Sequence, residues 1–180
     1  SATVHFPIWH KEIEDIIVLK NNKGTEDNRV RKLDYSIQLS KLFYERFIND
    51  EDITLFSPHE VPELYEAWGT DEFDSLYETA ERKTSVSKKK VSAQSLFFDM
   101  LKERAETGRI YIMNIDHCNT HSSFKDRIYM SNLCQEITLP TDPIQHIDGD
   151  GEIALCILSA INVGKLNYLE YLEGLCDLAV

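Results

Sequence analysis

The stretch Thr107-Gly108-Arg109-Ile110-Tyr111-Ile112-Met113-Asn114-Ile115 decides the fold class of this sequence. Residues 110–115 form a short apolar run of the length and composition typical of a buried strand. Gly108 is a typical helix stop, and residues 92–108 before it have the apolar spacing of an amphipathic helix. A helix that leads through a glycine into a buried strand is typical of α/β proteins.

The same alternation of strands and helices extends in both directions along the chain. The spacing predicts strands at residues 3–6, 31–37, 53–56, 110–115 and 153–161. It predicts helices at residues 8–20, 39–48, 61–68, 71–82, 92–108 and 167–180, a polar loop at residues 21–28, and a solvated loop or helix start at Lys88-Lys89-Lys90. About five strands separated by helices predict a parallel α/β arrangement. Because both ends stop abruptly and no linker divides the chain, we expect residues 1–180 to be a single, partial domain cut from a larger one.

Composition limits the classes of function. The chain has 180 residues, 42% of them hydrophobic, and a formal net charge of -12. This charge argues against binding to nucleic acid or to an anionic membrane, because both would repel it. No apolar run approaches the roughly 18 residues of a membrane helix, and no secretory signal is visible. We therefore expect a cytoplasmic protein.

The four cysteines, Cys118, Cys134, Cys156 and Cys176, form no C-x-x-C pair and are sparse for a disulfide scaffold. Cys118 lies between His117 and His121, a spacing that suggests zinc, but a second pair of ligands is lacking. We expect no metal there and interpret the segment as a polar loop at the carboxyl end of a strand. Cys156 and Cys176 fit apolar patterns, for which buried core cysteines are the default.

The segment Ser131-Asn132-Leu133-Cys134-Gln135-Glu136 is the strongest candidate site. If the segment is extended, Asn132, Cys134 and Glu136 point to the same side. A carboxylate beside a thiol disfavours the thiolate, so neutral thiol chemistry such as hydrogen-atom transfer fits better than nucleophilic attack. Taken alone, the pattern is weak, because such a spacing most often belongs to a surface strand.

Taken together, these segments resemble the large, catalytic subunit of class I ribonucleotide reductase. The matching phrases run in family order along nearly the whole chain. They are Thr3-Val4-His5-Phe6-Pro7, Trp9-His10, Leu19-Lys20-Asn21-Asn22, Asp52-Ile53-Thr54-Leu55-Phe56-Ser57-Pro58-His59, Thr107-Gly108-Arg109-Ile110-Tyr111, Asp116-His117-Cys118-Asn119-Thr120-His121, Ser131-Asn132-Leu133-Cys134, Glu136-Ile137, Leu139-Pro140-Thr141 and Gly151-Glu152-Ile153-Ala154-Leu155-Cys156. The most specific matches to the family are the two cysteine motifs, Ser131-Asn132-Leu133-Cys134 with Glu136-Ile137, and Gly151-Glu152-Ile153-Ala154-Leu155-Cys156.

The resemblance implies a role for each site residue. Cys134 would become a transient thiyl radical that abstracts the 3′ hydrogen of the ribose. Glu136 would take the 3′-hydroxyl proton, and Asn132 would hydrogen-bond the substrate hydroxyls. Leu133 and Gln135 would line the substrate beside them. Cys156 would be one of two reducing cysteines, with its partner upstream of Ser1.

The resemblance also implies the surroundings of the site. The fold would be about strands two to six of a ten-stranded α/β barrel with the finger loop threaded through it. The substrate would be a ribonucleoside diphosphate. The chain would bind no cofactor directly, the radical would come from a metal-containing small (beta) subunit, and thioredoxin or glutaredoxin would be the reductant. The remaining parts of the large subunit would complete an alpha dimer, and the isolated chain would be inactive.

Two other classes of function remain open. One is a non-catalytic interaction module derived from the reductase, against which the joint presence of Asn132, Cys134, Glu136 and Cys156 argues. The other is a cysteine hydrolase that pairs Cys134 with His117 or His121, against which the neighbouring Glu136 argues.

Overall fold

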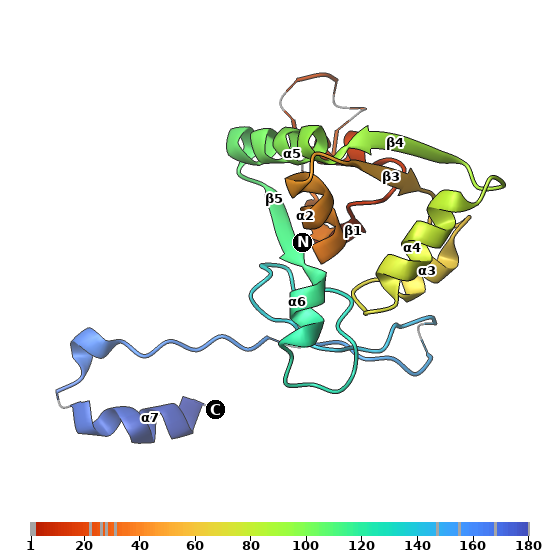
Figure 1. Ribbon diagram of the computed structural model, residues 1–180. Helices are drawn as coiled ribbons and strands as arrows, with labels where there is room; N and C mark the ends of the chain where they lie inside the picture. Colours follow the sequence, from red (N-terminus) through yellow and green to blue (C-terminus); the bar gives the residue numbers. More distant parts are fainter. Residues whose placement is uncertain are drawn as a thin grey trace. The chain divides into compact units, whose positions relative to one another are not determined.

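The computed structural model describes residues 3–21, 23–25, 27, 29–30, 32–146, 148–154, 156–167 and 169–179. The chain divides into two compact units, Ser1–Asp142 and Pro143–Val180. In Figure 1 the first unit runs from red to cyan and the second is blue. The units are described separately below.

The first unit contains two small sheets (Figure 1). The described strands are β1 (Thr3–Pro7), β2 (Asp34–Leu39), β3 (Asp52–Phe56), β4 (Lys88–Ser92) and β5 (Ile110–Asn114). β1, β2 and β5 form a parallel sheet in the order β1-β2-β5, and β3 pairs antiparallel with β4. The helices are α1 (Ile13–Ile17), α2 (Lys41–Ile48), α3 (Pro62–Glu66), α4 (Phe73–Arg82), α5 (Ala93–Thr107) and α6 (Ile115–Thr120).

The central strand β2 has one apolar and one polar side, both buried. Successive side chains of a strand point to opposite sides. Tyr35, Ile37 and Leu39 of β2 are buried on one side, where the Tyr35 hydroxyl donates to the Ile17 carbonyl of α1 at 2.9 Å. Ser36 and Gln38 are buried on the other, and the register pairs Ser36 with His5 of β1. This polar face lies under the candidate loop.

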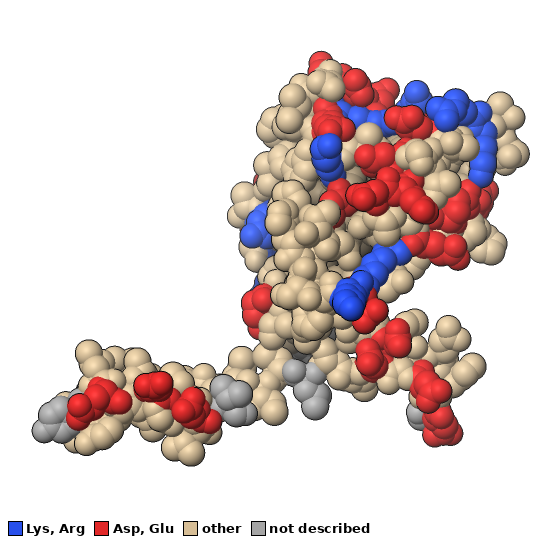
Figure 2. Space-filling model, turned by 60° about the horizontal axis from the view of Figure 1, so that its bottom comes forward, with Lys and Arg blue, Asp and Glu red and all other residues tan. Residues whose placement is uncertain are grey.

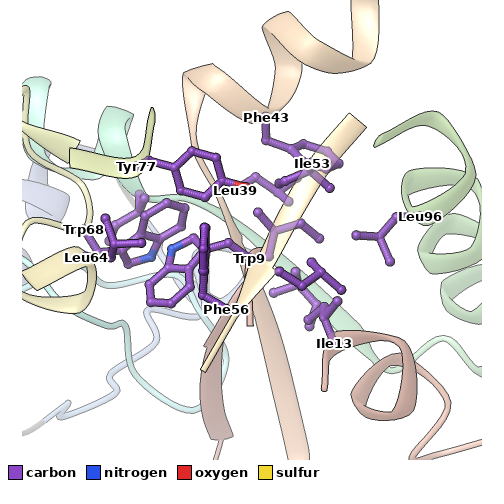
Figure 3. Close-up of a cluster of buried hydrophobic side chains, with 14 of the residues drawn as sticks. Trp9, Ile13, Leu39, Phe43, Ile53, Phe56, Leu64, Trp68, Tyr77 and Leu96 are labelled. Carbon is purple, nitrogen blue, oxygen red and sulfur yellow. The ribbon is translucent and has the colours of Figure 1, made fainter. Parts of the chain in front are cut away.

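Aromatic rings form the centre of the core. Trp68 packs edge-to-face on Phe73, with ring centroids 4.6 Å apart, and on Trp9 at 6.0 Å. The Tyr77 ring continues the cluster through Phe56, at 5.5 Å. Figure 3 shows Trp9, Phe56, Trp68 and Tyr77 gathered on one side of the buried cluster. These contacts fix α4 and the turn after α3 against β3 and the turn after β1.

Most predicted elements of the first unit are confirmed, with shifted bounds. The strands predicted at residues 3–6, 31–37, 53–56 and 110–115 are β1, β2, β3 and β5, although Arg31 lies outside the described residues. The predicted helices at residues 39–48, 61–68, 71–82 and 92–108 are α2, α3, α4 and α5, and the helix predicted at residues 8–20 contracts to α1. The loop predicted at residues 21–28 contains Asn22, Glu26 and Asn28, which also lie outside the described residues.

The prediction for Lys88-Lys89-Lys90 was wrong, because these residues begin β4 and pair with β3. The arrangement is therefore not wholly parallel. Lysine side chains are compatible with an edge strand, since the long stems can run along the sheet while the ammonium groups reach out. Here the Lys88 ammonium donates to the Lys83 carbonyl at 2.6 Å and also to the Glu81 carbonyl.

The second unit has little regular structure among its described residues. It contains two short 3₁₀ turns, η2 (Val163–Lys165) and η3 (Leu169–Tyr171), and the helix α7 (Leu172–Ala179). The helix predicted at residues 167–180 is confirmed only over this shorter range, and Tyr168 and Val180 lie outside the described residues.

The prediction of a buried strand at residues 153–161 was wrong for the part of this segment that the structure describes. Leu155 lies outside the described residues. Ile157 is 91% exposed and Leu158 85% exposed. A strand needs a neighbour to pair its backbone groups, and no described residue pairs with this segment. The described residues of this apolar run therefore form no strand and remain exposed.

Candidate functional site

The candidate loop, residues 131–137, is closed at its base by hydrogen bonds. The Asn132 amide N–H donates to the Ile137 carbonyl at 3.3 Å, and the Ile137 N–H donates to Asn132 Oδ1 at 3.1 Å. The Ser131 hydroxyl also donates to the Ile137 carbonyl, at 2.5 Å. Asn132 thus closes the loop through both its backbone and its side chain.

The tip of the loop is a turn. The Gln135 N–H donates to the Asn132 carbonyl at 3.2 Å, and Gln135 has a φ of 65°. The prediction of an extended segment was therefore wrong, because asparagine can close a turn with its own side chain and a left-handed residue reverses the chain. Cys134 lies within this turn and is exposed, as are Leu133 and Glu136.

The loop is attached to β1 at three points. The Thr3 hydroxyl donates to the Leu133 carbonyl at 2.8 Å. The His5 ring contacts the Ser131 carbonyl through Nε2 and the Gln135 side-chain amide through Nδ1, both at 3.2 Å. The turn that carries Cys134 is therefore positioned by the first strand of the sheet.

The segment leading into the loop is held from three elements. Gln38 Nε2 on β2 donates to the Tyr129 carbonyl at 2.7 Å. Asn119 on α6 both donates to the Ile128 carbonyl at 3.0 Å and accepts from the Ile128 N–H at 2.8 Å. The Arg127 guanidinium donates to the carbonyl of Glu66, the last residue of α3, and to that of Trp68 just after it. These bonds satisfy the backbone of a segment that has no sheet partner.

The polar loop predicted at residues 117–121 was wrong for residues 117–120, because these residues belong to the helix α6, which begins at Ile115. Asn119 Nδ2 donates to the Ile115 carbonyl and the Thr120 hydroxyl to the Asp116 carbonyl, so polar side chains here bond back to the helix itself. The His117 and His121 rings lie one helical turn apart, with centroids at 5.2 Å. Among the described residues, no group of three histidine, cysteine or acidic side chains could hold a metal ion.

A hollow of about 370 Å³ lies between α6, the end of β5 and the loop. Its lining residues are Ile112, Met113, Asn114, His117, Cys118, His121, Ser122, Ser131, Gln135 and Thr138. Cys134 is not among them, so the hollow does not join Cys134 to either histidine and gives the cysteine-hydrolase alternative no support. Cys118 is part of the lining, and burial raises the pKa of its thiol, which makes it a poor nucleophile.

Burial also shifts the pKa values of His5, which contacts the loop, and of Asp116 on α6. Burial lowers the pKa of His5, while its bond to the Ser131 carbonyl acts in the opposite direction. Burial raises the pKa of Asp116, although its carboxylate accepts the Lys41 N–H at the start of α2, at 2.6 Å. Figure 2 shows acidic side chains spread over the visible face with basic ones in separate groups, so this face offers no continuous basic surface for a phosphate backbone.

The predicted site residues fall into both units. Asn132, Leu133, Cys134, Gln135 and Glu136 share the loop of the first unit, whereas Cys156 belongs to the second, where it is exposed.

The residues that hold the loop were missed from the sequence. They are Thr3, His5, Gln38 and Asn119. A signal for Gln38 existed, because polar residues at positions 36 and 38 alternate with apolar ones in a buried strand.

The comparisons with known proteins agree on one family. A family model described as the barrel domain of ribonucleotide reductase matches residues 1–178. The chain is 55% identical over 176 residues to the ribonucleoside-diphosphate reductase subunit alpha of Haemophilus influenzae, covering 94% of this chain and 23% of that protein. It is 52% identical over 186 residues to that of Buchnera aphidicola from Schizaphis graminum, covering 100% and 24%.

A third relative, the ribonucleoside-diphosphate reductase 1 subunit alpha of Escherichia coli, is 54% identical over 149 residues, covering 80% of this chain and 20% of that protein. The chain thus spans about a quarter of the length of the curated relatives it matches. No described helix is long and apolar enough to cross a membrane. From its sequence, its α/β fold and its loop, the chain belongs to the ribonucleotide reductase barrel-domain family.

Proposed function

We propose that this chain is a segment of the catalytic subunit of a ribonucleoside-diphosphate reductase, and that residues 131–137 are its active-site finger loop. One observation carries the proposal: an anchored turn presents the Cys134 thiol, exposed, between Asn132 and Glu136. The relatives' printed names, ribonucleoside-diphosphate reductase subunit alpha, support the substrate class.

The proposed chemistry begins with a thiyl radical on Cys134 that takes the 3′ hydrogen of the ribose. Glu136 accepts the proton of the 3′-hydroxyl as the 2′-hydroxyl leaves as water. Cys156 and a second cysteine outside this chain supply two electrons and two protons and become a disulfide. Cys134 then returns the hydrogen atom to C3′, so the net change replaces the 2′-hydroxyl by hydrogen.

Asn132 has a double task in this proposal. Its Oδ1 is already engaged by the Ile137 N–H, which leaves its Nδ2 group as the donor for a substrate hydroxyl. Leu133 and Gln135 flank the thiol and complete the contact with the substrate.

The partners follow from the same proposal. The radical would be supplied by a metal-containing small (beta) subunit, and thioredoxin or glutaredoxin would reduce the disulfide. The rest of the large subunit, assembled as an alpha dimer, would provide the second redox cysteine and the phosphate contacts. We place the enzyme in the cytoplasm and expect the isolated chain to be inactive.

The test is turnover by the full-length subunit that carries this segment, mixed with its radical-bearing small subunit. Cys134→Ser should abolish reduction of cytidine diphosphate with dithiothreitol as reductant, because a serine hydroxyl cannot supply a thiyl radical. Cys176→Ser, in the exposed helix α7, is the matched control and should retain turnover. Reduction by the Cys134→Ser enzyme at the control rate would refute the proposal.

A further inference from the structure

His5 contacts the candidate loop on both sides of its turn. Its Nε2 lies 3.2 Å from the Ser131 carbonyl, before the turn, and its Nδ1 lies 3.2 Å from the side-chain nitrogen of Gln135, within the turn. The third bond from β1 to the loop, from the Thr3 hydroxyl to Leu133, lies one strand pleat away. The imidazole therefore bridges the two limbs of the turn that carries Cys134.

The partners determine the protonation state of the ring. A carbonyl can only accept, so Nε2 must carry the hydrogen that is donated to Ser131. The Gln135 amide nitrogen can only donate, so Nδ1 must present its lone pair. With the Gln135 amide in this orientation, both bonds form together only in the neutral imidazole with the hydrogen on Nε2. Protonation puts a second N–H against the Gln135 amide and removes that bond.

We propose that His5 is a positioning residue for the loop that carries Cys134, and that it clamps the turn to β1 only as the neutral imidazole. The clamp rests on contacts in this chain alone, and its consequence for catalysis rests on the proposed function of Cys134. His5 acts on catalysis only by holding the loop in place, and the proposal gives it no contact with the reacting atoms.

The expected pH dependence has a definite sign. The pKa of His5 is lowered from 6.5 because the ring is buried. A histidine with a lowered folded pKa stabilises the docked loop above its unfolded pKa, and this stabilisation is lost as the pH falls through the folded pKa. The docked turn should therefore be intact above pH 6.5 and loosen below it.

Other ionisable side chains lie on the elements packed around His5. β1 carries His5 alone, and Tyr35 of β2 faces the opposite side of the sheet. Asp34 of β2 is paired with Lys20 at 2.5 Å. The remaining groups on elements around the ring are Tyr111 of β5, which pairs with Ser36 on the same face of the sheet as His5, and Cys134 and Glu136 in the loop, both exposed. His117 on α6 and His121 just after it line the neighbouring hollow.

The test is a pH titration of this chain by nuclear magnetic resonance, following the His5 ring nitrogens and the backbone amides of Gln135 and Ile137. The ring should titrate with a midpoint below 6.5, with Nε2 protonated at higher pH, and the two amides should shift with the same midpoint. A His5 ring that titrates while both amides stay constant overturns the proposal.

Two variants separate the clamp from simple packing. In His5→Gln, the amide can donate to Ser131 and accept from Gln135, so the loop should stay docked and lose its pH dependence. In His5→Phe, both bonds are lost, and hydrogen exchange of the Ile137 amide should accelerate by on the order of tenfold, the effect of losing one to two net hydrogen bonds. Equal exchange in His5→Phe and the original chain would contradict the clamp.

Activity in the full-length subunit gives the second readout. Turnover should fall below pH 6.5 with histidine at position 5, and this acid limb should be absent in His5→Gln. If neither the original enzyme nor any variant reduces ribonucleotides, the proposed function fails. The titration still tests whether His5 clamps the loop to β1. If His5→Gln keeps the same acid limb as histidine, the positioning role is wrong.

Discussion

Gln38 is a fully buried polar side chain with a separate partner for each end of its amide. Its Oε1 accepts the Trp68 indole N–H at 2.7 Å, and its Nε2 donates to the Tyr129 carbonyl at 2.7 Å. Buried polar groups stabilise a fold only when their hydrogen bonds are made. Gln38 therefore joins the aromatic core to the segment that leads into the candidate loop.

Gln38→Leu should lower the free energy of unfolding by about 2 to 4 kcal/mol, because it leaves the indole N–H and a carbonyl buried without partners. Urea unfolding followed by tryptophan fluorescence measures this loss, since Trp9 and Trp68 both lie in the core. Gln145→Leu, at an exposed position, is the control and should change stability by less than about 0.5 kcal/mol. Equal unfolding midpoints for the two variants would contradict this role of Gln38.

At the scale of residues, the candidate reactive groups could be named from the sequence, but their geometry could not. Asn132, Cys134 and Glu136 could be named from a motif. Their arrangement could not, because the turn depends on a positive φ at Gln135, a residue type that gives no turn signal. The contacts of His5 with residues more than a hundred positions away leave no local trace either.

A partly buried ion pair connects three elements of the first unit. Glu81 on α4 accepts two hydrogen bonds from the Arg46 guanidinium on α2, at 2.7 and 2.6 Å. It also accepts the Thr54 hydroxyl on β3, at 2.5 Å. Planar paired bonds of this kind fix geometry as well as charge, so the network sets how α2 and α4 meet β3.

The network should make stability depend on pH. Burial would raise the pKa of Glu81, but the bonds from Arg46 and Thr54 outweigh it and lower the pKa below 4.5. A lowered carboxyl pKa contributes stability above the unfolded value, which is lost as the pH falls through the folded value. Glu81→Gln should therefore be less stable near neutral pH and lose less stability on acidification below about pH 4.5.

Thermal unfolding at neutral and acidic pH measures this difference. Glu78→Gln on the same helix is the matched control, because its only described ion pair, with Arg82, is long at 3.9 Å and exposed. An acid loss in Glu81→Gln as large as that in the original chain would assign the pH dependence to other groups.

Elements with local start and stop signals could be predicted. Ser92 caps α5 by accepting the Ser95 N–H, and Gly108 ends it with a φ of 66°, as the sequence indicates. The strand β4 could not be predicted, because its three lysines show no hydrophobic alternation. They form a strand only because the edge of β3 is there to pair with them. The run at residues 153–161 has the composition of a strand, but no described residue pairs with it.

At the scale of the whole molecule, the fold class could be predicted and the completeness of the site could not. Alternating helices and strands imply an α/β protein from local patterns alone. Exposed apolar side chains in the second unit, such as Ile153, Ile157 and Leu158, require neighbours to be buried. The chain spans about a quarter of its relatives, so the proposed activity belongs to the larger subunit.

The central claim, that Cys134 abstracts the 3′ hydrogen, is tested most directly in a chimera. Residues of this chain replace the matching 176-residue segment of the Haemophilus influenzae subunit, which is 55% identical, and the cognate small subunit is added. Cytidine diphosphate tritiated at C3′ is the substrate, because a hydrogen held on a thiol can exchange with water. We predict deoxycytidine diphosphate together with release of tritium to solvent, and neither from Cys134→Ser. Tritium release that persists in the Cys134→Ser chimera, at the rate of the original, would contradict the account.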